Sequence, residues 1–128
     1  MDISSSLSIA VMALLLLIAC FQLLLALGLP FGEYAMGGFH TILPKNLRVV
    51  SLINAVILLF IGLVFLVHTN KVTVLTFLPT SILVWVFTVF LALNTIANAF
   101  SKSTKERVVM TPISGLLFIL CLMIVLLN

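Results

Sequence analysis

Four long apolar segments, separated only by short polar connections, constrain this chain more than any other feature. They cover about residues 7–29, 47–67, 79–98 and 109–127 of the 128-residue sequence. A helix needs about 20 mostly apolar residues to cross the hydrocarbon core of a bilayer. Only 7% of the residues are charged, whereas a soluble domain carries roughly 25%. The sequence therefore predicts an all-α, polytopic membrane protein, a single domain (residues 1–128) of four transmembrane helices in a bundle.

The sparse polar residues argue against several classes of function. The net charge is +3, but the six basic residues are spread over three connections and form no stripe for nucleic acid. Cys20 and Cys121 lie inside apolar segments without a Cys-Xaa-Xaa-Cys spacing, which argues against disulfide exchange and structural zinc. No phosphate-binding loop, nucleophile elbow or zinc-protease motif occurs. We therefore expect no nucleic acid, cofactor or metal, and an enzyme is the less favoured interpretation.

The connection between the first two apolar segments concentrates the unusual residues. The stretch of residues 28–48, which spans this connection, holds Glu33, His40, the only tyrosine (Tyr34) and four of the six glycines. The Gly37-Gly38 pair permits positive φ and close backbone approach. Irregular backbone at membrane depth is tolerated only where protein covers it or where it lines a watery cavity. Two arrangements remain open: a glycine-rich cap folded back over the bundle, or a segment lying flat on the lipid head groups.

The distribution of basic residues predicts the orientation in the membrane. Cytoplasmic loops carry the excess of lysine and arginine. The first and third connections hold five of the six basic residues, and the opposite side of the bundle holds only Lys71. We therefore predict a multi-pass protein of the cell membrane whose loops 30–46 and 99–108 are cytoplasmic and whose two termini are extracytoplasmic.

This orientation gathers the candidate ligand-binding residues at one membrane face. The first hairpin contributes four of them and the second hairpin the other four, and none is assigned a catalytic role: Glu33, Tyr34, His40 and Arg48, then Asn94, Asn98, Glu106 and Arg107. A carboxylate at membrane depth is costly, and it is usually paired or functional.

Two of these assignments leave alternatives open. For Glu33, a structural ion pair with Arg48 or Arg107 is favoured over a proton-carrying or ligand-binding carboxylate, and a freely solvated side chain is the third interpretation. Asn94 and Asn98 either bond to neighbouring helices, which is favoured, or line a polar pocket beneath the first connection. His40 with Glu33 supplies too few ligands for a metal site.

Prolines predict the starts of the last two helices, because proline is favoured in the first helical turn. Pro79 and Pro112 are assigned to these positions.

Partners are predicted from charge and small residues. Anionic lipid head groups are expected at four basic side chains: Lys45, Lys102, Lys105 and Arg107. A stripe of small and polar residues on the third segment packs either within one protomer or against a homo-oligomeric or other membrane-protein partner.

The first connection resembles the signature of a family of small bacterial four-helix integral membrane proteins of unassigned function. The residues that carry the resemblance are Gly28-Leu29-Pro30-Phe31-Gly32-Glu33-Tyr34-Ala35-Met36-Gly37-Gly38, then His40, Leu43-Pro44 and Leu47-Arg48, with Asn94 and Glu106-Arg107 later in the chain. Members of that family often carry tryptophan where Phe31 and Met36 stand here. The resemblance implies the four-helix fold and a bacterial membrane, and it implies no reaction.

The expected function is non-enzymatic: binding of a small amphiphile or lipid, or service as a transport-associated accessory subunit. An alternative is a membrane-embedded enzyme that acts on a lipid-like substrate, with Glu33 and His40 as its acid–base pair. A second alternative is an immunity-type or interaction protein.

Overall fold

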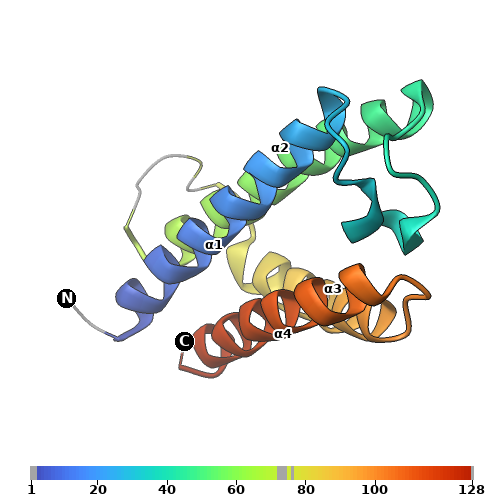
Figure 1. Cartoon of the computed structure of the whole chain (residues 1–128). Coiled ribbons are helices and arrows are strands. Elements are labelled where there is room, and N and C mark those ends of the chain that lie inside the picture. The colour runs from blue at the N-terminus through green and yellow to red at the C-terminus, as the bar shows by residue number, and fades with distance from the viewer. Residues whose placement is uncertain (1–2, 72–74, 76, 128) are drawn as a thin grey trace.

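The protein is built from four long helices, joined as two helical hairpins (Figure 1). The computed structural model describes residues 3–71, 75 and 77–127. The helices are α1 (Ile3–Ala26), α2 (Lys45–His68), α3 (Thr80–Ala99) and α4 (Thr104–Leu127), with short 3₁₀ helices η1 (Gly32–Tyr34) and η2 (Met36–Gly38) in the first connection. The described part of the chain contains no strand. Each long helix is apolar and long enough to cross a membrane, which confirms the all-α, multi-pass prediction.

The two hairpins pack tightly within themselves and more loosely against each other. The most extensive contacts join α1 to α2 and α3 to α4, whereas the α1–α4 and α2–α3 contacts are smaller. In Figure 1 the hairpins lie close together near the two termini and diverge toward the opposite end, where the first connection lies between them. The molecule is therefore wedge-shaped, and the first connection fills the wide end.

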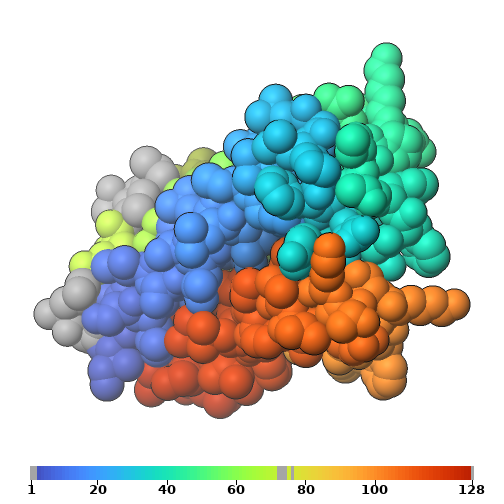
Figure 2. Space-filling view, in the orientation of Figure 1, coloured from blue at the N-terminus to red at the C-terminus, as the bar shows by residue number. Residues whose placement is uncertain are grey.

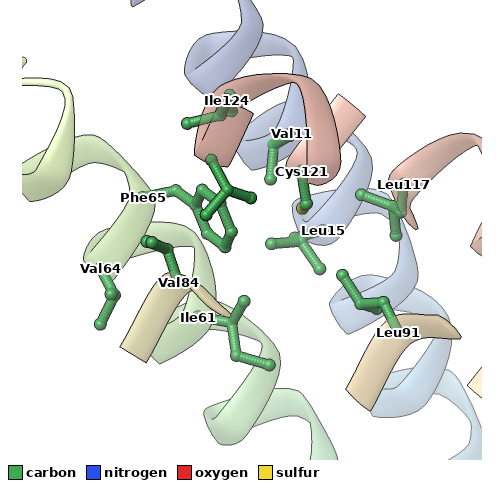
Figure 3. Packing of buried hydrophobic residues seen from close by; sticks show 11 residues of the cluster. Val11, Leu15, Ile61, Val64, Phe65, Val84, Leu91, Leu117, Cys121 and Ile124 are labelled. Atoms are coloured by element: carbon green, nitrogen blue, oxygen red, sulfur yellow. The ribbon is translucent and has the colours of Figure 1, made fainter. Parts of the chain in front are cut away.

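The apolar core lies where all four helices meet (Figure 3). Its buried side chains come from every helix: Val11, Leu15, Ile61, Val64, Phe65, Val84, Leu91, Leu117, Cys121, Ile124 and Val125. Helix association in lipid depends on close van der Waals packing, which small residues permit. Gly62 is such a residue, because a Cβ at this position would run into the Met12 sulfur of the facing helix.

The end of α1 explains why the first helix stops before its apolar segment does. The helix ends at Ala26 because Gly28 adopts a φ of 90°. Its N–H donates to the Leu25 carbonyl at 3.0 Å, and the Leu29 N–H donates to the Leu24 carbonyl at 3.2 Å. This is the Schellman pattern of helix termination. The predicted segment of residues 7–29 is corrected accordingly, because the helix begins at Ile3 and leaves the apolar residues 27–29 outside it.

The start of α4 differs more from the prediction, and the assignment of Pro112 to a first turn is wrong. The helix begins at Thr104 rather than near residue 109, and Pro112 lies inside it. Ser103 explains the earlier start, because its Oγ accepts the Glu106 N–H at 3.3 Å. A serine three residues before a glutamate is the sequence of a capping box, which satisfies a free N–H in the first turn. The third helix does begin beside its proline, since Pro79 directly precedes α3.

The first connection forms a cap over the wide end of the wedge (Figure 2, cyan beside the orange start of α4). Ala35 and Leu43 are buried against Leu25 of α1, and Met36 packs beside them. Of the two arrangements open from the sequence, the structure has the folded-back cap. Of the aromatic side chains of the cap, Phe31 and Phe39 are exposed and Tyr34 is partly buried.

Candidate functional site

A polar cavity lies between the hairpins beneath the cap. Its volume is about 370 Å³, and all four helices and the cap line it. Its walls carry a carboxylate, amides and a hydroxyl, from Gln22, Asn54, Asn94, Asn98, Glu106 and Ser114. A second cavity of about 310 Å³ adjoins it and shares most of these polar side chains. The divergence of the hairpins thus creates polar space inside otherwise apolar helices.

The amides of three different helices meet in this space without bonding to one another. Gln22 of α1, Asn54 of α2 and Asn94 of α3 line both cavities. The Gln22 side-chain oxygen is buried and, within the described residues, has no hydrogen-bond partner. Asn98 does have one, because its Nδ2 donates to Ser114 Oγ at 3.1 Å. Buried polar groups in folded proteins are normally hydrogen-bonded, so the Gln22 oxygen is an exception that lies on the wall of the cavity.

Glu106 is the carboxylate of the cavity, and two elements hold it in place. Its side chain is only 7% exposed although it lies in the first turn of α4. Its backbone N–H is capped by Ser103, and its Oε1 accepts the Gly37 N–H of the cap at 3.2 Å. Gly37 can present this N–H because its φ of 81° suits glycine. Within the described residues no donor reaches the other oxygen, Oε2.

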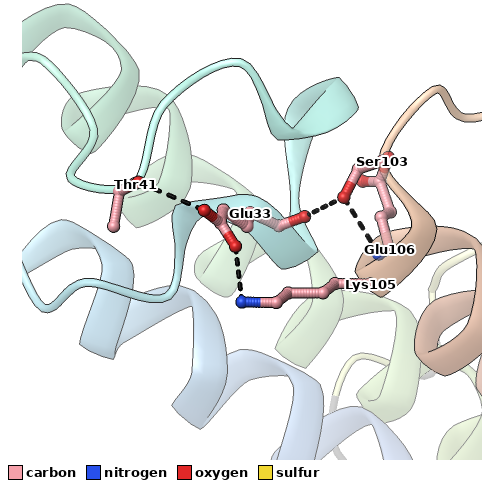
Figure 4. A network of polar contacts seen from close by, with 5 residues as sticks. All are labelled: Glu33, Thr41, Ser103, Lys105 and Glu106. Carbon is pink, nitrogen blue, oxygen red and sulfur yellow. Dashed lines mark hydrogen bonds and ion pairs between the residues drawn. The ribbon is translucent and has the colours of Figure 1, made fainter.

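Glu33 lies on the outer side of the cap and ties it to the second hairpin (Figure 4). Its carboxylate pairs with Lys105 Nζ at 2.6 Å and accepts a bond from Thr41 Oγ1 at 3.4 Å. Ser103 Oγ donates to the Glu33 backbone carbonyl at 2.5 Å. The hydrogen bond from Lys105, and then its positive charge, lowers the pKa of the Glu33 carboxyl below its ordinary value. Glu33 therefore fastens the cap, and Glu106 is the acid that faces inward.

The predicted pairing of Glu33 with an arginine is wrong. Arg48 Nε instead donates to the Ala26 carbonyl at 2.9 Å, where it neutralises a free carbonyl at the end of α1. Arg107 donates to the Ser101 carbonyl at 3.0 Å and is largely exposed. Lys105, in the first turn of α4, takes their place because the helix starts earlier than predicted.

The remaining predicted site residues divide into two groups. Tyr34, Asn94 and Asn98 line the polar cavity together with Glu106. His40 is exposed and does not line it. Among the described residues no three His, Cys, Asp or Glu side chains are grouped closely enough to hold a metal ion.

A comparison of the chain with models of protein families, with curated proteins and with solved structures finds no match. The chemistry of the site is therefore argued from its own geometry.

An apolar groove runs beside the polar cavity, between α1 and α4. Its volume is about 580 Å³, and the cap closes one end of it through Phe31 and Tyr34. Leucines of α1 and Val109 of α4 form its sides. The groove and the polar cavity share five wall residues: Ile18, Phe21, Tyr34, Met110 and Ile113. A polar compartment and an apolar compartment therefore adjoin each other at one site.

Several residues of the site were not predicted from the sequence. Gln22, Asn54 and Ser114 line the cavity, and none of them was assigned to the site. The signal for Gln22 and Asn54 was their position inside long apolar helices, where polar side chains are costly and usually functional. The capping-box sequence from Ser103 to Glu106 was the signal that would have placed Glu106 in a first helical turn.

Proposed function

We propose that the protein is a membrane-embedded binding protein for a small amphiphile. One observation carries the proposal: a polar cavity and an apolar groove share a wall beneath the cap. A polar head group in the cavity would meet the unpartnered amides, and an apolar chain would lie in the groove between α1 and α4. The cavity is at the small end of the range for ligand sites, roughly 300–1,000 Å³, which suits a head group rather than a whole lipid.

The polar side chains support a ligand of this kind on energetic grounds. Burying an amide or hydroxyl without a partner costs roughly 1–3 kcal/mol in proteins. The buried Gln22 oxygen incurs this cost unless water or a ligand supplies its bond, and Asn54 and Asn94 line the same cavity. A ligand that satisfies these amides would bind with a specific orientation.

The alternative of an enzyme that uses Glu33 and His40 has less support. Within the described part of the chain, the Glu33 carboxylate contacts Lys105 and Thr41, and His40 is not among its partners. Neither residue lines the polar cavity. Acid–base chemistry on a ligand in the cavity would require a group within hydrogen-bond reach of it.

The proposal includes an orientation in the membrane. The end of the bundle with the cap carries Lys45, Arg48, Lys102, Lys105 and Arg107, and the opposite end carries Lys71. Cytoplasmic loops hold such an excess, so we place the cap and the mouth of the cavity at the cytoplasmic face of the cell membrane. A bound amphiphile would then enter from the inner leaflet.

Ligand retention by the full chain tests the proposed function. The protein is placed in phosphatidylcholine nanodiscs that contain one 12-carbon probe, either dodecylamine, dodecanol or dodecanoate, and bound probe is detected by native mass spectrometry. We expect one probe molecule per chain for at least one of the three. Failure to retain any of them above the level of an unrelated four-helix protein would refute the proposal.

Two matched variants locate the binding. Ala97 lines the polar cavity, so Ala97→Phe should fill it and abolish retention. Ala99 lies nearby on α3, is exposed and does not line the cavity, so Ala99→Phe should retain the probe. Equal retention by the two variants would show that the probe binds elsewhere.

A further inference from the structure

Glu106 is the only charged side chain that faces the polar cavity within the described residues. The other lining residues are apolar, amide or hydroxyl, and none is lysine, arginine or histidine. The basic groups closest in sequence are engaged elsewhere, since Lys105 pairs with Glu33 and Arg107 bonds to the Ser101 carbonyl. The cavity therefore presents a negative charge without a positive partner of its own.

In the first turn of α4, the Glu106 carboxylate does not make the hydrogen bond that a glutamate makes in a complete capping box. In a complete capping box, the glutamate side chain returns to the N–H of the capping residue. Here the Ser103 N–H is already bonded, because it donates to Ser101 Oγ at 3.1 Å. Glu106 instead turns toward the cap, where the Gly37 N–H holds Oε1. Oε2 is left as an oriented acceptor at the cavity wall.

A second group in the cavity also needs a hydrogen-bond donor. The Gln22 side-chain oxygen is a buried acceptor without a partner among the described residues. It comes from α1, whereas Glu106 comes from α4, so the two acceptors belong to different hairpins. A ligand that satisfies both must bring hydrogen-bond donors, and the carboxylate favours a donor that is positively charged.

We infer that the head group bound in the polar cavity is a protonated amine carried on an apolar chain, with Glu106 as its ionic partner. This inference rests on the proposed function and specifies its ligand class. An unpaired carboxylate in a membrane is expensive, and an ammonium group with several N–H donors neutralises it and can also reach the Gln22 oxygen. An anionic head group would add a second uncompensated negative charge.

The chemistry of the cavity also predicts how strongly related head groups bind relative to one another. A primary alcohol supplies one neutral O–H donor, so it binds more weakly than the amine. A quaternary ammonium supplies charge but no N–H, so it too falls below the amine. A carboxylate ranks last because it is repelled by Glu106 and offers no donor at neutral pH.

The test uses the nanodisc assay with four probes of one chain length: dodecylamine, dodecyltrimethylammonium, dodecanol and dodecanoate. On the wild-type chain, we expect the amine to be retained at least about tenfold better than the alcohol, since hydrogen bonds to charged groups contribute about 1.5–3 kcal/mol. If the alcohol or the carboxylate were retained as strongly as the amine, the inference would be overturned and the proposed function would stay intact. Retention of none would overturn both.

Glu106→Gln provides the matched variant. The amide oxygen of glutamine can still accept the Gly37 N–H, so the cap stays in place while the charge is lost. We expect the variant to bind dodecanol like the wild type and to lose the preference for dodecylamine. A preference for the amine that survives in Glu106→Gln would refute the assignment to Glu106. If the variant binds no probe, the ranking on the wild-type chain still decides the ligand class.

Discussion

Ser103 holds together two parts of the molecule that are far apart in sequence, and Ser103→Ala should therefore loosen the cap. Its hydroxyl donates to the Glu33 carbonyl of the cap at 2.5 Å and accepts the Glu106 N–H of α4 at 3.3 Å. Removing a serine that caps a helix costs about 0.5–2 kcal/mol. A net hydrogen bond contributes about 0.5–1.5 kcal/mol more. The capping cost falls on α4 in the docked and the open state alike, so the docked cap should lose only the bond to Glu33, about 0.5–1.5 kcal/mol, relative to the open one.

Hydrogen exchange measures this loss directly. Amides of the cap exchange when it opens, so their rates follow the opening equilibrium. We expect peptides that cover residues 32–39 to exchange about 2- to 12-fold faster in Ser103→Ala, by the usual relation of about 1.4 kcal/mol per factor of ten. Peptides from the core of the bundle, such as those around Leu117, should keep their wild-type rates.

The neighbouring hydroxyl supplies the control. Thr104 is exposed, and its Oγ1 only accepts a 3.4 Å contact from Arg107. Thr104→Ala should therefore leave exchange of the cap within about twofold, since exposed substitutions usually change stability by under about 0.5 kcal/mol. Wild-type exchange in Ser103→Ala, or equal acceleration by both variants, would refute the role given to Ser103.

Three further predictions concern the ion pair, the helix packing and the orientation. Because Lys105 lowers the pKa of the Glu33 carboxyl, the stabilisation is present above the ordinary pKa of about 4.3 and is lost as pH falls through the lowered value. The wild type should therefore melt above Glu33→Gln at pH 7, and the gap should narrow as pH falls below about 4.3 or in 1 M salt; a gap that does not change with pH would contradict this. Gly62→Leu should lower the melting temperature in mild detergent, because overpacking against Met12 costs typically about 1–3 kcal/mol, whereas Gly115→Ala, which meets only an ordinary contact of 3.6 Å, should be tolerated. A cysteine introduced at Thr104 should resist an impermeant thiol reagent in intact cells and react after permeabilisation; labelling in intact cells would invert the proposed orientation.

The helices were predictable because their signal is repeated over many residues. Each apolar segment is long enough to cross a bilayer, and one misplaced turn does not change that conclusion. The errors lie at helix ends, where single residues decide. Gly28 ended α1 early, and Ser103 started α4 early, and in both cases a local hydrogen bond outweighed the apolar pattern.

The site was only partly predictable, because its geometry depends on how the hairpins diverge. Sequence spacing grouped Glu33, Asn94, Asn98 and Glu106 at one end of the bundle, and the structure places three of these four on the cavity wall. The sequence spacing did not indicate that the Glu33 side chain points outward to Lys105. That choice follows from the path of the cap, which positive-φ glycines set and which no periodic pattern encodes.

The wedge has a mechanical consequence. The core near the termini holds all four helices, so it acts as a pivot, and each hairpin is a lever that extends from it. Leu15 is the last buried core residue of α1, and the roughly 11 residues from there to the end of the helix span roughly 17 Å, so a rotation of about 5° at the pivot moves that end by about 1.5 Å. A shift of that size is enough to break a hydrogen bond, and the contacts of Ser103 and Lys105 with Glu33 span the two lever tips. Any change in the angle between the hairpins would therefore act most strongly on the side chains that fasten the cap.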